Sequence, residues 1–194
     1  MPRIMTQYKE EVRKKIIETA YHLFLTKGYR GTTMDAIAGA LGVTKPALYQ
    51  YFPGKEDLFA AVAERGRQEL VGILERSYQN RDIRGGSEAL FDALSLYAPQ
   101  FYGMFSEMIL MAPYNDRIRQ ILEEDLRGDV RVIERFITSQ QETGFVSFQH
   151  NAHMLAVACH AMINGLLFDI AVGMDKGEAK KIWIATVEAL LREG

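Results

Sequence analysis

The chain has very little cysteine, with Cys159 alone in 194 residues. A single thiol excludes a disulfide within the chain and suits a reducing cytosol. The sequence also lacks a basic N-terminal segment followed by an apolar run, so we expect no secretory signal. Glycine-rich phosphate loops and nucleophile elbows are missing as well. These absences argue against an enzyme, and we assign no catalytic residues and no cofactor.

Net charge is low, at −2, and would not by itself suggest a nucleic-acid partner. The two signs are nevertheless separated along the chain. Residues 1–55 hold nine basic and four acidic side chains, a net of +5, and the remainder carries −7. A basic N-terminal third followed by an acidic remainder is typical of a DNA-reading head joined to a domain with another task.

Residues 32–58 have the pattern of two short helices joined by a tight turn, followed by the start of a third. Thr32 is the predicted N-cap of the first helix, with Asp35 as its capping-box partner. Gly42 can take the left-handed conformation that stops this helix, and Thr44 is the predicted N-cap of the next. The pattern predicts a helix-turn-helix, whose second helix can enter the DNA major groove.

Many positions of this stretch carry a family resemblance, in order and without a gap: Thr33, Ile37, Ala38, Gly42, Val43, Thr44, Pro46, Leu48, Tyr49, Tyr51, Phe52, Lys55, Glu56, Asp57 and Leu58. Together they resemble the DNA-binding region of the TetR (tetracycline-repressor) family of bacterial transcriptional regulators. The match covers about the first 60 residues, near a third of the chain. It implies a helix-turn-helix domain over residues 1–54 and a helical effector-binding and dimerisation domain over residues 55–194.

The rest of the chain has helical periodicity and no convincing alternating strands. We therefore predict an all-α fold of about nine helices, with a three-helix N-terminal head. The clearest break lies at residues 81–86. Further helices are expected at residues 8–27, 55–80, 87–112 (divided into short pieces by Pro99 and Pro113), 115–142, 150–172 and 177–192.

Candidate DNA contacts lie on and around the helix that starts at Thr44. Base edges would be read by its exposed face, for which the candidates are Lys45, Pro46, Ala47 and Gln50. Hydroxyl and ammonium groups at helix N-termini suit phosphate oxygens. On that ground the phosphate candidates are Thr33, Thr44, Tyr49, Tyr51 and Lys55, and the resemblance implies the same roles. The alternative for the two tyrosines is packing within the three-helix head.

The segment from Tyr97 to Met111 is rich in aromatic residues and methionine. It has two interpretations, a small-molecule cavity or ordinary core packing. The resemblance implies a ligand in this domain, and we predict a mainly apolar effector bound by Tyr97, Phe101, Tyr102, Phe105 and Met108, with His160 and Asn164 as the polar groups. The rival is that His160 and Asn164 pair across a dimer interface and the aromatics fill a core.

Residues 150–172 are apolar nearly all round. Their length would suit a membrane span, but the polar side chains within them are expensive in lipid, so we expect a buried helix and no membrane. The small residues Ala158, Ala161 and Gly165 share one side and suit a close helix contact. The resemblance implies a homodimer through the last two helices. His150 and His153 form only an i, i+3 pair without further ligands, so we expect no metal site.

The preferred hypothesis is a cytoplasmic dimeric repressor that binds a double-stranded DNA operator and is released by a small effector. An effector can change DNA binding only if it prefers one of two states of the dimer. A second hypothesis is a DNA-binding protein without an effector, whose C-terminal domain serves only assembly or a protein partner. A third, an all-α enzyme, lacks any catalytic constellation.

Overall fold

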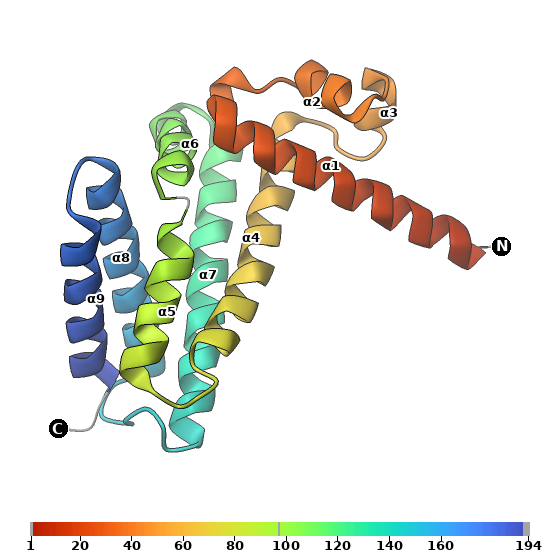
Figure 1. Cartoon of the computed structure of the whole chain (residues 1–194). Helices are drawn as coiled ribbons and strands as arrows, with labels where there is room; N and C mark the ends of the chain where they lie inside the picture. The colour runs from red at the N-terminus through yellow and green to blue at the C-terminus, as the bar shows by residue number, and fades with distance from the viewer. Residues whose placement is uncertain (1, 97, 192–194) are drawn as a thin grey trace. The chain divides into compact units, whose positions relative to one another are not determined.

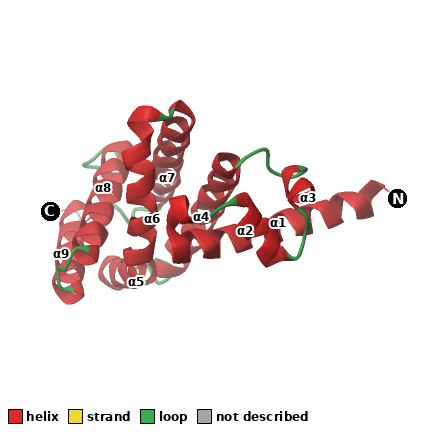
Figure 2. Cartoon of the chain, turned by 90° about the horizontal axis from the view of Figure 1, so that it is seen from above, coloured by secondary structure: helices red, strands yellow, loops and turns green. Residues whose placement is uncertain are grey.

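The computed structural model describes the backbone of residues 2–96 and 98–191, and the side chains of residues 7–96, 100 and 102–191. Over these residues the chain forms nine α-helices and one 3₁₀-helix and no strand (Figure 1, Figure 2), which confirms the predicted all-α fold. The helices are α1 (Pro2–Gly31), α2 (Met34–Leu41), α3 (Lys45–Tyr49), α4 (Lys55–Ser77), α5 (Ile83–Ser95), α6 (Ala98–Met111), η1 (Ala112–Tyr114), α7 (Asp116–Glu142), α8 (Ala152–Ala171) and α9 (Lys176–Leu191).

The helices pack into two compact units, each with its own buried core. The first unit comprises Met1–Gly66 and Gly103–Asp125, and the second comprises Arg67–Tyr102 and Leu126–Gly194. The boundaries fall within α4, α6 and α7, so these three helices contribute residues to both units. The units describe packing, and the functional division after residue 54 stays a prediction.

The core of the first unit is built around aromatic side chains. The ring centroid of Phe24 lies 5.6 Å from that of Tyr29 and 5.7 Å from that of Phe59. Leu48 of α3 and Met108 of α6 are fully buried in the same core. Burial of a large apolar side chain contributes about 1.5–3 kcal/mol. Because α3 has only five residues and would not persist alone, Leu48 is what anchors it.

The start of α2 lies one residue later than predicted. Thr33, not Thr32, is the N-cap, and its Oγ1 accepts a hydrogen bond from the backbone N–H of Ala36 at 3.1 Å. Thr32 is buried, and its hydroxyl lies 2.8 Å from the carbonyl oxygen of Gly28 and 3.1 Å from that of Leu23. The reason is that Gly28 leaves the helical conformation (φ 74°, ψ 171°), so the last carbonyls of α1 need another donor.

The end of α2 follows the prediction. Gly42 takes the left-handed conformation (φ 69°, ψ 26°), which suits a residue without Cβ. Its N–H donates to the carbonyl of Gly39 at 3.2 Å, and the N–H of Val43 donates to that of Ala38 at 3.0 Å. These bonds satisfy carbonyls at the end of α2 and turn the chain toward Thr44, the N-cap of α3.

In the second unit, α9 packs against both α5 and α8, as Figure 1 shows. A buried polar cluster fixes the contact of α5 with α9. The indole Nε1 of Trp183 donates to the carbonyl oxygen of Ser87 at 2.9 Å. The Ser87 hydroxyl donates to Ile83 O at 2.6 Å and lies 3.0 Å from the Tyr78 hydroxyl. Burial raises the pKa of Tyr78 to about 12, so this phenol stays protonated at neutral pH.

The structure shortens the predicted break at residues 81–86 and confirms that residues 87–112 are divided near Pro99. The break over residues 81–86 is shorter than expected, because Asp82 caps α5 by accepting from the N–H of Arg84 at 3.1 Å. Pro99 lies in the first turn of α6, where an N–H donor is not needed, and does not interrupt it. Pro113 lies in the 3₁₀-helix that follows. The expected short pieces are therefore two helices, of 13 and 14 residues.

Candidate DNA interface and effector site

The predicted base-reading residues lie in α3 and directly after it, around the buried residue Leu48. Leu48 is fully buried, whereas Lys45, Pro46 and Gln50 are exposed and Ala47 is half-buried. Burying Leu48 in the first-unit core therefore fixes which side of this short helix is presented outward. The arrangement offers an ammonium, an amide and apolar atoms, which are the groups that read base edges.

Lys45 is held by a carboxylate of the preceding helix. Its Nζ lies 3.0 Å from Oδ2 of Asp35, and both side chains are exposed. The hydrogen bond with Asp35, followed by its charge, raises the pKa of Lys45, which stays an ammonium at neutral pH. Asp35 thus pairs across the turn and does not complete the predicted capping box. An exposed ion pair of this kind is weak, so little free energy opposes the separation of Lys45 from Asp35.

The predicted phosphate contacts differ in exposure. Thr33 and Thr44 are exposed, and the Thr33 hydroxyl keeps its proton free to donate while its oxygen caps α2. Tyr49 is 42% exposed. Tyr51 is half-buried and packs against the first-unit core, as in the alternative interpretation for the tyrosines.

Lys55, the first residue of α4, already binds two backbone carbonyls. Its Nζ donates to the carbonyl oxygens of Tyr29 at 2.8 Å and Thr32 at 2.9 Å. It also lies over the ring of Tyr29, 4.1 Å from the centroid. Burial lowers the pKa of Lys55, and the charges of Glu56 and Glu107 oppose that shift. Two of the three ammonium donors are therefore used inside the protein.

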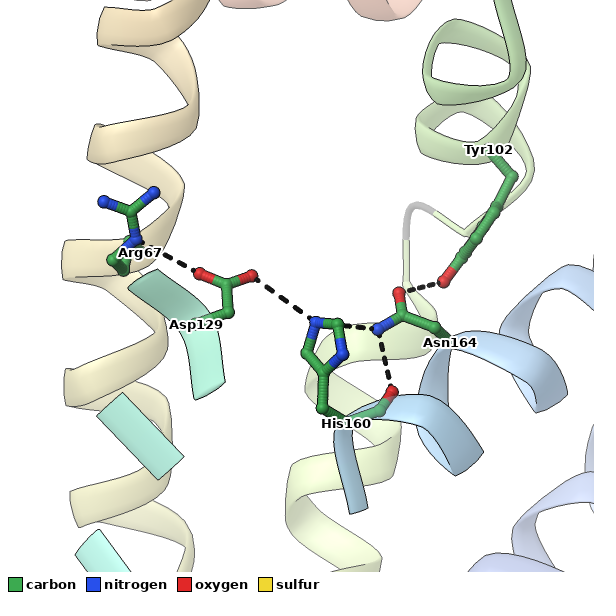
Figure 3. Close-up of polar contacts among 5 residues, drawn as sticks. All are labelled: Arg67, Tyr102, Asp129, His160 and Asn164. Atoms are coloured by element: carbon green, nitrogen blue, oxygen red, sulfur yellow. Dashed lines mark hydrogen bonds and ion pairs between the residues drawn. The ribbon is translucent and has the colours of Figure 1, made fainter. Parts of the chain in front are cut away.

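The predicted effector residues fall into separate groups. Tyr97 and the side chain of Phe101 lie outside the described residues. Met108 is buried in the core of the first unit, and Phe105 is a half-buried residue of that unit. A second group of three, Tyr102, His160 and Asn164, lies together in the second unit (Figure 3).

These three side chains form a chain of hydrogen bonds. The hydroxyl of Tyr102 donates to Oδ1 of Asn164 at 2.5 Å. The Asn164 amide donates to the backbone carbonyl of His160 at 2.8 Å and lies 3.1 Å from His160 Nε2. Burial lowers the pKa of His160 and raises that of Tyr102, so both are neutral at pH 7. With the amide as donor, His160 Nε2 accepts, and its ring proton resides on Nδ1.

Two charged residues that the sequence prediction missed lie beside this chain of hydrogen bonds. Oδ2 of Asp129 on α7 lies 4.0 Å from His160 Nε2, and Oδ1 lies 3.4 Å from Nε of Arg67 on α4 (Figure 3). Arg67 passes directly over Gly128, where a Cβ atom would meet its guanidinium. The nearest sequence signal was the His160 and Asn164 pair, one turn apart in an apolar helix. Nothing in the sequence linked Arg67 or Asp129 to it.

Helix α8 is long and apolar enough to cross a membrane by length and composition alone, but a third of that stretch is buried within the protein. Leu155, Ile163 and Leu167 lie in the second-unit core. The opposite side is uncovered, with Val157 44% and Phe168 50% exposed. Ala158, Ala161 and Gly165 are also exposed, and a Cβ at Gly165 would meet nothing within 4 Å.

The histidines do not gather into a metal site. His153 lies 3.0 Å from Glu134, and His150 is exposed. Among the described residues, no group of three or more histidine, cysteine or carboxylate side chains is placed to hold a metal ion.

An open groove of about 680 Å³ lies in the second unit between the C-terminal halves of α4 and α7. Leu74, Tyr78 and Phe136 form its apolar lining, and Arg81 and Arg135 are among its charged residues. None of the predicted effector residues whose side chains the structure describes lines this groove. The groove and the hydrogen-bonded chain are therefore distinct features of the same unit.

Comparison with known protein families identifies residues 16–62 as matching the model of bacterial regulatory proteins of the tetR family. The chain is 30% identical over 165 residues to the transcriptional activator FasR of Mycolicibacterium smegmatis, covering 79% of this chain and 69% of that protein. It is 26% identical over 172 residues to the transcriptional repressor BepR of Brucella suis, covering 81% and 79%.

Solved structures share the fold over nearly the whole chain. A TetR-family regulator from Rhodococcus sp. superposes with a TM-score of 0.78 at 18% identity, covering 94% of this chain and 100% of that one. A transcriptional regulator from Saccharomonospora viridis in complex with choline gives a TM-score of 0.67 at 22% identity, covering 95% and 100%. The helix-turn-helix and the helices that follow it are thus shared with these proteins.

Proposed function

The chain belongs to the TetR family of bacterial transcriptional regulators, and on that premise we propose that it is a dimeric repressor that a small, mainly apolar effector releases from its operator. Regulators of this family bind DNA and are not enzymes. What we add concerns the operator-reading residues, the dimer contact and the effector site. A DNA partner of this kind implies a cytoplasmic protein.

The observation that carries the DNA role is the orientation of α3. Leu48 is its only fully buried residue, whereas Lys45 in α3 and Gln50 directly after it are exposed. We propose that these two, with Pro46 and Ala47, contact base edges. Thr33, Thr44, Tyr49 and Tyr51 are proposed to face the phosphates. The ammonium of Lys55 already donates to two backbone carbonyls, so we do not propose it as a phosphate contact.

Dimerisation through α8 and α9 is supported by the uncovered apolar side of α8. Val157 and Phe168 are half exposed beside the small residues Ala161 and Gly165, and Ile182 of α9 is 40% exposed. Small side chains let a second helix approach closely. A dimer also supplies the two heads that a repeated operator requires, with half-sites about 34 Å or a multiple apart.

The effector proposal rests on Tyr102, His160 and Asn164, which lie together in the second unit. Neutral polar groups within an apolar unit suit a mainly apolar guest with one or two polar atoms. In the S. viridis relative, choline is the bound molecule, so that relative supports ligand binding by this fold. Repression is supported by the similarity to BepR.

The experiment is selection of the genomic fragments that the purified protein binds, followed by footprinting on the enriched sites. We expect a repeated site whose halves are protected together, and release of the DNA by compounds found in a thermal-shift screen. Failure to enrich any sequence would overturn the DNA role.

A second candidate is a regulator without an effector, whose second unit serves assembly alone. One observation favours it: Tyr102 and Asn164 satisfy each other, which leaves this polar pair complete without a guest. The screen separates the two candidates. Compounds that stabilise the protein and release DNA support the effector, whereas stable operator binding throughout the screen supports assembly.

A further inference from the structure

The turn that leads into the helix-turn-helix is held from two sides by charged side chains. Gly28 to Thr32 join α1 to α2. On one side, the Glu107 carboxylate of α6 accepts a hydrogen bond from the backbone N–H of Arg30 at 2.7 Å. On the other, Lys55 of α4 donates to the carbonyls of Tyr29 and Thr32. Charged side chains therefore hydrogen-bond this turn from both sides, and such charge-assisted hydrogen bonds are stronger than neutral ones.

The backbone is shaped to fit this clamp. Gly28 has φ 74° and ψ 171°, a region that is essentially restricted to glycine. A Cβ at this position would lie 2.5 Å from Oε1 of Glu107, so the carboxylate also occupies the space that a side chain would need. The conformation requires glycine at this position, and a side chain here would also displace the Glu107 carboxylate.

Lys55 brackets the reading helices at both ends. It is the first residue of α4, directly after the loop that follows α3, and its partner Thr32 lies 23 residues earlier in the chain, just before α2. The Lys55 ammonium thus joins the segment before α2 to the segment after α3. Tyr29, which carries one of the two carbonyls, is itself fixed in the aromatic core by Phe24 and Phe59.

We propose that Glu107 and Lys55 are positioning residues for operator recognition, which hold the helix-turn-helix in its reading orientation through the turn from Gly28 to Thr32. Base readout depends on a fixed orientation of the reading side chains, whereas attraction to phosphate does not. Loss of the clamp therefore weakens specific binding and spares non-specific binding. This inference rests on the proposed DNA role but does not need the effector.

The test uses the full chain and two probes, a duplex enriched from a random-sequence pool by the wild-type protein and a scrambled duplex of the same composition. Glu107→Met and Lys55→Met should each lower the affinity ratio between the two probes about tenfold or more, as expected for loss of a charged hydrogen bond. Glu107→Gln keeps a hydrogen-bond acceptor and Lys55→Arg keeps a donor. Both variants should retain most of the wild-type affinity ratio between the two probes. Glu124→Met and Lys27→Met match the charge changes at exposed positions of the same unit and should leave the ratio unchanged.

Salt dependence separates this role from a phosphate contact. Loss of a phosphate ligand would weaken both probes alike and lower the salt slope by about one unit. That result for Lys55→Met would overturn its positioning role.

For Glu107, the direct readout is hydrogen exchange at the Arg30 amide, which Glu107→Met should accelerate about tenfold while Glu107→Gln retains protection. Unchanged exchange in a variant with wild-type helical circular dichroism would overturn the clamp. Failure of the wild-type protein to enrich any duplex would instead overturn the proposed DNA function, and the exchange measurement would still decide the clamp.

Discussion

The hydroxyl of Tyr102 on α6 donates to Oδ1 of Asn164 on α8 at 2.5 Å, and the amide nitrogen of Asn164 faces His160. The two ends of the Asn164 amide are therefore used in opposite directions. Because the ring of Tyr102 also meets Phe168 edge-on, with centroids 6.4 Å apart, the hydroxyl is held toward the amide. An effector that binds Asn164 Oδ1 must use its second lone pair or displace the Tyr102 hydroxyl.

We predict that Tyr102→Phe lowers the free energy of unfolding by about 1–2 kcal/mol, because Asn164 Oδ1 loses its donor in a partly buried site. Urea denaturation measures the change. Tyr114→Phe, at a residue that is 92% exposed, is the matched control and should have no effect. In a double-mutant cycle with Asn164→Ala, a coupling of about 0.5 kcal/mol or more is expected. Strictly additive losses would show that the hydrogen bond does not contribute.

The buried imidazole of His160 predicts a loss of stability in mild acid. Burial places its folded pKa below the unfolded value, so the unfolded chain binds the proton first as pH falls through about 6.5. Stability contributed by the neutral ring is thus present above that pH and lost below it. The groups that face the ring are Asn164 and, at 4.0 Å, Asp129, which is itself bound by Arg67.

Unfolding free energy measured from pH 7.5 to 5 should fall more steeply for the wild-type protein than for His160→Gln. His153→Gln removes an exposed imidazole bound to Glu134 and serves as the control. Equal slopes for wild type and His160→Gln would mean that Asp129 compensates for the burial of the charge.

Local sequence chemistry predicted the head well. Gly42 stopped α2, because only glycine reaches its left-handed conformation without strain. Leu48, one of the residues that carry the family resemblance, is fully buried. The N-cap was misplaced by one residue, because Gly28 bends the chain three residues before α1 ends and thereby draws Thr32 into the turn. Such a shift depends on backbone angles that composition does not reveal.

Long-range partners account for what the sequence could not predict. Two of the hydrogen bonds join residues that are 62 positions apart in the sequence. They pair Arg67 with Asp129 and Tyr102 with Asn164. Glu107 meets the turn before α2 from 77 residues away. Helical periodicity assigns a residue to one side of its own helix but gives no register between distant helices, so these pairs had no local signal.

The uncovered side of α8 predicts that Gly165→Leu breaks the dimer without unfolding the subunit. A Cβ at Gly165 meets nothing within 4 Å in its own chain, so only a second chain would be obstructed. Sedimentation should show monomers, and operator affinity should fall because two heads no longer bind together. Gly66→Leu adds the same side chain at an exposed glycine of α4 with equally empty surroundings and should remain dimeric. A stable dimer of Gly165→Leu would exclude this face.

The pair formed by Lys45 and Asp35 predicts opposite outcomes for its two members. Lys45→Ala and Gln50→Ala should each change the base preferred at one operator position, since a bidentate base contact is worth about 1–3 kcal/mol. Asp35→Asn keeps the shape of α2 but frees Lys45 from its 3.0 Å partner and removes a negative charge near the phosphates. That variant should bind every duplex more tightly and retain the wild-type base preference. Sequencing of fragments selected by each variant measures the preference, and titration of the wild-type site measures the affinity. If Lys45→Ala and Gln50→Ala both select the wild-type sequence, then the exposed side of α3 does not read the bases.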